Sequence, residues 1–331
     1  MEGYMPTNQN YFLLRRLSRV KLFTLFTIGF AVQVLSVTAS AAWTSGNKLL
    51  LTGGVSSIEG AAGGGLTPWA IIGGYGTNNE IGGSAFYTHT AVDDFDLDVF
   101  GVALGYKDRV EVSLARQKFD VSDLRQKVLS GLGADAIGRD EITQTVVGLK
   151  VRVAGNAVLD QDRWLPQIAV GAQYKKNNDG DFVTGGVIGA KDDEGIDFYV
   201  SATKLFLGQS LLVSSTLRMT KANQFGILGF EGDRNDDYEP QFEFSTAYLL
   251  SKRLAVGVEY RSKPSNLSNT VGGAVDLSED DSYDFFVAYA PSKNLSITAA
   301  YVDLGNIANV PAVGADYGDQ KAIYLSAQLG F

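Results

Sequence analysis

Beyond residue 41, apolar and polar side chains alternate with a period of two along segments of about ten residues. Near the end of the chain, for example, Leu295, Ile297 and Tyr301 alternate with Ser296 and Thr298. A period of two places alternate side chains on opposite faces of a β-strand. Beyond residue 41, no apolar run reaches the ~20 residues that a membrane-spanning helix needs. The pattern therefore predicts an antiparallel all-β protein.

The alternating segments predict fourteen strands, whose connections are by turns short and long. The strands are expected near 48–55, 69–76, 82–91, 97–106, 110–118, 143–154, 166–176, 196–207, 210–220, 241–250, 254–262, 282–290, 295–303 and 320–331. The long connections are 119–142, 177–195, 221–240, 263–281 and 304–319. Tight turns at one end and long outer loops at the other are typical of a transmembrane β-barrel. We therefore predict one antiparallel transmembrane barrel over residues 42–331.

A soluble all-β sandwich or barrel, with its apolar face in a core, is the competing interpretation. Two features of the sequence favour the membrane barrel. Aromatic residues gather at the segment ends, as a girdle at the membrane interface requires. The last strand contains Tyr324 and ends on Phe331, similar to the C-terminal sorting signal of bacterial outer-membrane barrels.

The Gly-rich stretch at 53–69 bears on the strand count. It lacks the Lys-Ser/Thr pair and the helix start of a phosphate-binding loop. Because glycine lets backbones pack closely, the stretch can form a tight outer hairpin or fold into the lumen. If it folds inward, the first two strands are lost, the count becomes twelve, and the pore is partly plugged.

The first 41 residues have the organisation of a cleavable signal peptide. Four basic residues between positions 15 and 21 precede an uncharged run, 22–37, and the small residues Ala39 and Ala41 follow. Removal of this segment takes away those four cations and Glu2, which leaves 24 basic and 36 acidic residues, a net charge of −12. Such an acidic chain repels the phosphates of nucleic acid, so we expect no nucleic-acid partner.

Composition limits the available chemistry. The chain of 331 residues contains no Cys and one His, which excludes disulfides, thiolate sites and His-rich metal sites, and we expect no cofactor. His89 is the only imidazole, and outer-membrane lipid hydrolases use a His near a Ser. Ser84 is five positions away, however, so the two side chains are expected on opposite strand faces. We therefore predict that the protein is not an enzyme.

Charged residues at the polar positions of the strands form the most informative group. The alternation predicts that they face the lumen: Glu111, Lys150, Arg152, Lys175, Arg218, Glu243, Glu259, Arg261 and Asp284. Either they line a water-filled passage and set its ion preference, or they pair across strands to fill a narrow, closed barrel.

Acidic residues cluster on the predicted outer loops. The candidates for cation binding are Asp192, Asp193, Glu194, Asp233, Asp236, Asp237, Glu279, Asp280 and Asp281. Their carboxylates could bind calcium or magnesium, including the ions that bridge lipopolysaccharide. The stretch 233–237 lacks the spacing and the Gly of an EF-hand loop, so solvated acidic loops are the favoured interpretation and no metal site is predicted.

Several longer stretches resemble signature segments of an uncharacterised Gram-negative family. These are 48–55, 59–69, 160–167, 190–195, 220–226 and 301–305. The family is catalogued as domain-of-unknown-function family 3034, and the resemblance implies an outer-membrane β-barrel across nearly the whole mature chain. It implies no activity, substrate or catalytic residue.

The sequence thus favours a barrel in the outer membrane of a Gram-negative bacterium that passes or exports small polar solutes. The alternative function is a closed structural or adhesive barrel whose acidic loops bind cations, polysaccharide or a partner protein. The expected partners are outer-membrane lipid, lipopolysaccharide and the barrel-assembly machinery. The oligomeric state is open.

Overall fold

The computed structural model describes residues 48, 50–51, 53, 55–133, 135, 137–185, 188–267, 269–270 and 275–331. The predicted signal peptide, 1–41, lies outside the described residues. In this part of the chain, no helix is long and apolar enough to cross a membrane.

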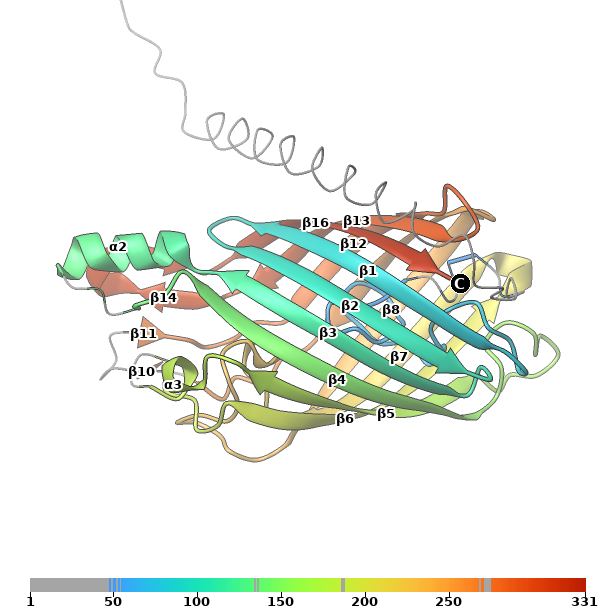
Figure 1. The fold of residues 1–331 in the computed structure, drawn as a ribbon, viewed down its shortest axis with the longest axis horizontal. Helices are drawn as coiled ribbons and strands as arrows, with labels where there is room; N and C mark the ends of the chain where they lie inside the picture. The colour runs from blue at the N-terminus through green and yellow to red at the C-terminus, as the bar shows by residue number, and fades with distance from the viewer. Residues whose placement is uncertain are drawn as a thin grey trace, which may run out of the picture. The chain divides into compact units, whose positions relative to one another are not determined.

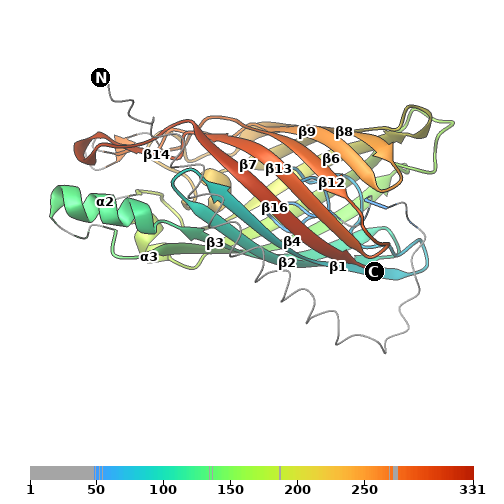
Figure 2. The same cartoon turned by 90° about the horizontal axis from the view of Figure 1, so that it is seen from above.

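Twelve antiparallel strands form one closed barrel (Figures 1 and 2). Each strand pairs with its neighbours in the chain, and β16 pairs with β1 to close the sheet. The barrel strands are β1 (Ile81–Val92), β2 (Asp96–Tyr106), β3 (Val110–Asp120), β4 (Glu141–Ala154), β5 (Gln167–Asn177), β6 (Glu194–Phe206), β7 (Leu211–Thr220), β8 (Glu239–Ser251), β9 (Leu254–Arg261), β12 (Ser282–Tyr289), β13 (Leu295–Gly305) and β16 (Gln320–Gly330).

The long connections gather at one end of the barrel, as predicted. They carry α2 (Ser122–Leu132), α3 (Gly180–Val183), η2 (Gln224–Gly226), η4 (Pro311–Val313) and a small sheet of β10 (Asn269–Thr270), β11 (Val275–Asp276), β14 (Ala308–Val310) and β15 (Ala315–Tyr317). Figure 1 shows α2, α3 and β14 together at this long-loop end. The opposite, short-turn end holds η1 (Leu207–Gln209) and the end of β16.

The prediction of strands near 48–55 and 69–76 is wrong, and the alternative of a twelve-stranded barrel is confirmed. Residues 55–75 are buried, and their only ladder pairs among the described residues are the isolated bridges Ser56–Ala62 and Gly63–Pro68. Figure 1 shows this segment, in blue, inside the barrel. Its backbone is hydrogen-bonded mainly by wall side chains and by its own turns. It therefore fills the lumen instead of extending the sheet.

The predicted alternation of the strand faces is confirmed. In β13, Ile297 and Tyr301 are exposed on the outer face, and Ser296 and Thr298 are buried on the inner face. The same outward face runs around the barrel as a belt of large exposed apolar side chains, including Phe100, Leu104, Leu114, Leu149, Phe198, Leu217, Phe242 and Phe285. A belt of this size is unfavourable in water and favourable in lipid. The fold is therefore that of a transmembrane barrel.

Both β1 and the inner segment meet the end of the chain at the short-turn end. The backbone amides of Gly83 and Tyr75 donate to the Phe331 carbonyl at 2.7 and 3.1 Å. Gly74 has a φ of +77°, and a Cβ there would lie 2.3 Å from the Gly83 nitrogen. Only glycine fits this close crossing, where the chain leaves the lumen and begins β1.

Candidate functional site: a charged lumen closed by two segments

Two segments fill the lumen from opposite ends. The plug, residues 55–76, lies just before β1 and runs in from the short-turn end. The cap, residues 221–231, follows β7 in the connection to β8 and folds in from the long-loop end. The inward face of the strands contacts both, so the site is built from plug, cap and wall.

Glu59 of the plug is the centre of the charged layer. Its carboxylate is fully buried and contacts three cations of the wall, Lys175, Arg218 and Arg261. Arg261 binds it with both terminal nitrogens, at 2.8 and 3.0 Å. Burial acts to raise the pKa of Glu59, but the charges of Arg218, Arg261 and Lys175 outweigh it and hold that pKa well below the ordinary value. The plug is therefore anchored by an ionised acid.

The same cations are shared with acids of the wall. Arg218 contacts Asp197 at 3.0 Å and Glu243 through Nε, and its Nη1 donates to the Gln173 side chain at 2.6 Å. Lys175 contacts Asp197 at 2.6 Å. In this cluster, three carboxylates face three cations, so its formal charge is balanced without water or an external ion.

A second buried pair holds the plug by its backbone. Lys150 and Glu111 lie 3.1 Å apart, and each is 1% exposed. Glu111 accepts the backbone amides of Ala62 and Gly73 at 3.1 and 2.7 Å. Lys150 donates to the carbonyls of Ala62 and Ile71 at 2.8 and 2.9 Å. The wall side chains thus replace the strand partners that the plug lacks.

Two further acids contact the plug without a cation. Glu259 accepts the backbone amide of Leu66 at 2.8 Å and the Thr67 hydroxyl at 2.6 Å. Asp284 faces Glu259 from the neighbouring strand β12. Among the described residues, neither acid forms an ion pair.

Arg152 marks the short-turn mouth of the lumen. It contacts Asp108 at 2.6 Å and donates to the Asn78 side chain at 3.2 Å. Lys48 also reaches Asp108, at 2.7 Å. This group lies apart from the Glu59 cluster and fastens the chain where it enters the barrel.

The cap is joined to the charged layer through Phe225. Its carbonyl accepts hydrogen bonds from Lys175 at 3.1 Å and from Gln144 at 3.2 Å. Its ring lies against the guanidinium of Arg261, 4.4 Å from Cζ to the ring centroid. Gln224 and Phe225 both have positive φ, +43° and +62°, a strained conformation for residues other than glycine. Lys175 therefore bridges plug and cap.

Two of the long connections, 263–281 and 304–319, hold Gln224. Its backbone amide donates to Glu279 at 2.9 Å, and its side chain contacts Lys263 and the Asn306 carbonyl. The side chains of Glu279 and Lys263 are almost fully buried and lie 3.9 Å apart. Burial raises the pKa of Glu279 to about 7, although Lys263 opposes the shift, and burial lowers the pKa of Lys263.

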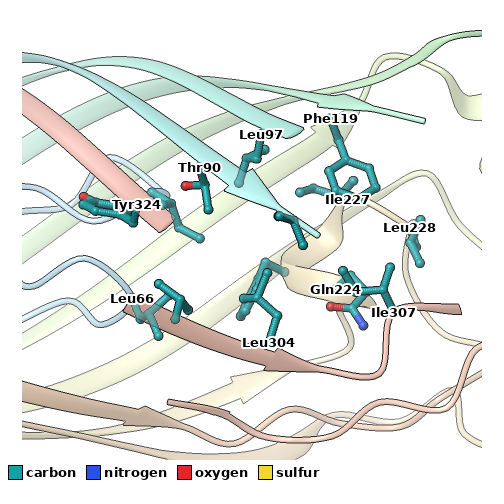
Figure 3. Close-up of a pocket in the computed structure, with 14 residues that line it drawn as sticks. Leu66, Thr90, Leu97, Phe119, Gln224, Ile227, Leu228, Leu304, Ile307 and Tyr324 are labelled. Carbon is teal, nitrogen blue, oxygen red and sulfur yellow. The ribbon is translucent and has the colours of Figure 1, made fainter. Parts of the chain in front are cut away.

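An apolar chamber separates plug and cap (Figure 3). Figure 3 shows Leu66 of the plug and Ile227 of the cap on opposite sides of it, with Leu97 and Phe119 of the wall beside them. The remaining cavity is about 40 Å³. Thr90 Oγ1, on the wall of this chamber, is buried and has no hydrogen-bond partner among the described residues.

The nine charged residues predicted to face the lumen are all buried on the inner side of the wall: Glu111, Lys150, Arg152, Lys175, Arg218, Glu243, Glu259, Arg261 and Asp284. That they line a conducting path stays a prediction. Sequence reasoning missed Glu59 and Asp197, which hold this cluster together. Glu59 is the only charged residue between Lys48 and Glu80, a signal that could have found it.

The acids predicted on outer loops are dispersed among protein partners. Asp193 and Glu194 both contact Lys176 at 3.0 Å, and Asp236 contacts Lys191 at 2.7 Å. Asp192 pairs with Phe230 in a backbone bridge, and the Asp237 carbonyl accepts a hydrogen bond from Asn235. Asp280 accepts a hydrogen bond from Asn306, and Asp281 accepts one from Tyr260. Glu279 is buried, and Asp233 is exposed. Within the described ranges, no group of three or more His, Cys, Asp or Glu is placed to hold a metal ion.

His89 faces the outside of the barrel. Its Nδ1 lies 2.9 Å from Asp98, which also accepts the Tyr87 hydroxyl at 2.6 Å. Ser84 is 2% exposed and faces inward, so the predicted separation of Ser84 and His89 on opposite faces is confirmed. The outward residues beside His89 on β1 and β16 are Tyr87, Ala91 and Leu325, and none is a serine.

A family model described as "Protein of unknown function (DUF3034)" matches residues 52–328. The chain belongs to this family. The match confirms the resemblance found in the sequence. It spans the plug, the cap and the barrel strands except for the last two residues of β16. No curated protein is similar enough in sequence to match this DUF3034 chain.

Solved structures similar to this DUF3034 protein include outer-membrane barrels. The KdgM porin is 13% identical with a TM-score of 0.44, covering 75% of this chain and 99% of its own. The NanC porin is 9% identical with a TM-score of 0.46, covering 75% and 98%. Omp33 of Acinetobacter baumannii is 10% identical with a TM-score of 0.42, covering 77% and 100%. These similarities are too distant to bear on function, and the barrel rests on its own strand pairing.

Proposed function

We propose that this protein is a gated outer-membrane channel for small polar solutes, whose passage is closed by the plug and narrowed by the cap. Export by the cleavable signal peptide 1–41 and residence among outer-membrane lipid and lipopolysaccharide, after insertion by the barrel-assembly machinery, belong to the same proposal. It assigns no catalytic role to His89.

The observation that carries the proposal is the chemistry of the contact between plug and wall. Glu59 meets Lys175, Arg218 and Arg261, and the plug backbone meets Glu111 and Lys150. A permanent core of apolar side chains would be at least as stable as buried ion pairs. The charged groups of the wall, in contrast, can be hydrated by water once the plug has left. When the plug leaves, the wall lines a hydrated passage of the kind found in porins.

Attachment of the plug supports the same function. The plug is continuous with β1 at one end, and the described residues 48, 50–51 and 53 precede it at the short-turn end. Glu59 is the only charged residue of the plug. Its carboxylate is therefore the only charge of the plug that must be hydrated when the plug leaves. Release of Glu59 is therefore the main electrostatic step in opening.

Glu59→Gln tests the proposal. The amide keeps the size of the side chain but removes the charge that three cations contact, so the plug is expected to leave more often. We expect single-channel recordings of the refolded mature chain in a planar bilayer to show at least tenfold more frequent openings than the wild type, a change of about 1.4 kcal/mol in the gating equilibrium.

Asp236→Asn is the matched control, because Asp236 pairs with Lys191 on the exposed loop surface. It should leave the opening frequency unchanged. Both variants must first show a heat-dependent gel mobility, which reports a folded barrel. A folded Glu59→Gln barrel that stays as silent as the wild type would support the closed structural barrel instead.

A further inference from the structure

Among the residues that the structure describes, Glu259 and Asp284 are the two buried acids of the lumen that form no ion pair with a cation. They are directly opposite each other on β9 and β12, and their exposed fractions are 2% and 6%. The Asp284 carboxyl contacts that of Glu259. In the same lumen, Glu59, Glu111 and Glu243 each contact a Lys or an Arg. The pair is thus an exception to the charge balance of its surroundings.

None of the described groups around the pair supplies a positive charge to it. Arg261 lies two positions from Glu259 on β9, but its guanidinium binds Glu59 and the Leu66 carbonyl. The pair is faced by Ser245 of β8, by Tyr324 of β16 and by residues 64–67 of the plug. Tyr324 is the only other titratable side chain among these, and it is ordinarily neutral.

The pair has unused hydrogen-bonding capacity at one point beside the plug. A Cβ on Gly65 would lie 3.5 Å from Glu259 Oε2, 3.5 Å from Tyr324 Cζ and 3.7 Å from Asp284 Oδ2. Asp284 Oδ1 and the Tyr324 hydroxyl are buried without a hydrogen-bond partner in the described part of the chain. Calcium and magnesium require about six or more oxygen ligands, whereas both Glu259 oxygens already accept hydrogen bonds from Leu66 and Thr67. A proton needs only the two carboxyl groups.

We propose that Glu259 and Asp284 form a proton-binding site, in which one shared proton lies between the two carboxyl groups and stabilises the plug in its position in the lumen. Two adjacent carboxylates in a dry site repel each other unless a proton is shared, as in the carboxyl dyads of aspartic proteases. Here the proton resides on Asp284, which donates to Glu259, and Glu259 stays an acceptor for Leu66 and Thr67.

A consequence for gating follows, and this part rests on the proposed function. When the proton dissociates to solvent at higher pH, two negative charges remain beneath residues 64–67 of the plug. Their hydration requires water to enter the contact, so the plug is expected to leave more often as pH rises. Glu279 in the long-loop end is a separate titratable group that holds the cap, and its contribution must be measured independently.

Infrared spectroscopy of the refolded mature chain tests the site without reference to conduction. Near neutral pH, the wild type should show the C=O stretch of a protonated carboxyl group, and the band should disappear on alkaline titration. Glu279→Gln should remove only the contribution of Glu279. The remaining band should be lost in Asp284→Asn and kept in Asp236→Asn. A spectrum in which Asp284→Asn and wild type are identical overturns the proposal. If Asp284→Asn does not fold, the alkaline titration of the protonated-carboxyl band in the Glu279→Gln variant decides whether the proton site exists.

Conductance then separates the two proposals. The opening frequency should rise with pH in the wild type and stay flat in Asp284→Asn, whose amide can donate to Glu259 at every pH. A protonated band that depends on Asp284, in a barrel that stays silent even without its plug, confirms the proton site and refutes the channel. A conducting barrel with no such band refutes the proton site and leaves the channel standing.

Discussion

The lumen contains two layers of opposite chemistry. In the charged layer around Glu59, every contact joins specific partners, and three carboxylates balance three cations. In the apolar chamber between plug and cap, Leu66, Ile227 and their neighbours pack without direction and leave a cavity of about 40 Å³. Specific charge pairing therefore holds the plug against the wall, whereas the apolar contact between plug and cap is less tightly filled.

The largest expected effect is in the charged layer. Arg218→Met removes the cation that contacts Glu59, Asp197 and Glu243, and leaves buried carboxylates without compensation. We expect the free energy of unfolding to fall by about 3–5 kcal/mol, measured by urea titration in detergent. Arg253→Met, on the exposed short turn between β8 and β9, should change it by less than about 0.5 kcal/mol. Equal effects of the two substitutions would contradict the account of the charged layer.

In the apolar chamber, loss of a polar group should have the opposite sign. Thr90→Val replaces a buried hydroxyl that has no hydrogen-bond partner within the described ranges, so we expect the free energy of unfolding to rise by about 1 kcal/mol. Thr88 lies on the same strand face, and its hydroxyl donates to Ser326 at 2.8 Å. Thr88→Val should therefore lower the free energy of unfolding by about 1 kcal/mol. The same sign for both substitutions would contradict the assignment of Thr90 as an unbonded hydroxyl on the wall of the apolar chamber.

The smallest effect concerns the attachment of the cap. Burial raises the pKa of Glu279 from its ordinary value of 4.5 to about 7. An acid whose pKa is raised in the folded state stabilises that state fully below its ordinary pKa, and this contribution is lost as pH rises to about 7. The protection factors of amides in residues 223–230 should therefore fall over this range. In Glu279→Gln they should stay constant, and a fall like that of the wild type would show that another group is responsible.

Much of the barrel could be predicted from the sequence because lipid on one side and polar groups on the other impose a strict alternation. The segment 295–303 was placed as a strand with Ile297 outward and Ser296 inward, and the structure has β13 in that position. The inward position of Lys150 and Arg218 followed from the same rule. Each of these predictions depends only on residues close together in the sequence.

The plug could not be predicted in this way. Residues 69–76 resemble a strand because their apolar side chains are buried, but the partners that bury them, such as Glu111 and Lys150, lie on distant strands. Similarly, the role of Glu59 depends on Lys175, Arg218 and Arg261, which the closed barrel brings together from three strands. Long-range pairing, not local pattern, decides whether a Gly-rich segment lies in the sheet or in the lumen.

The most direct test of the central claim is the single-channel conductance of a mature chain from which residues 55–76 have been deleted and replaced by a short Gly-Ser linker. After heat-dependent gel mobility has confirmed a folded barrel, this variant and the wild type would be compared in the same planar bilayer. The account predicts stable, ohmic steps from the deletion variant and rare openings from the wild type. A folded deletion variant that conducts no better than the wild type would contradict the claim that the plug closes a passage.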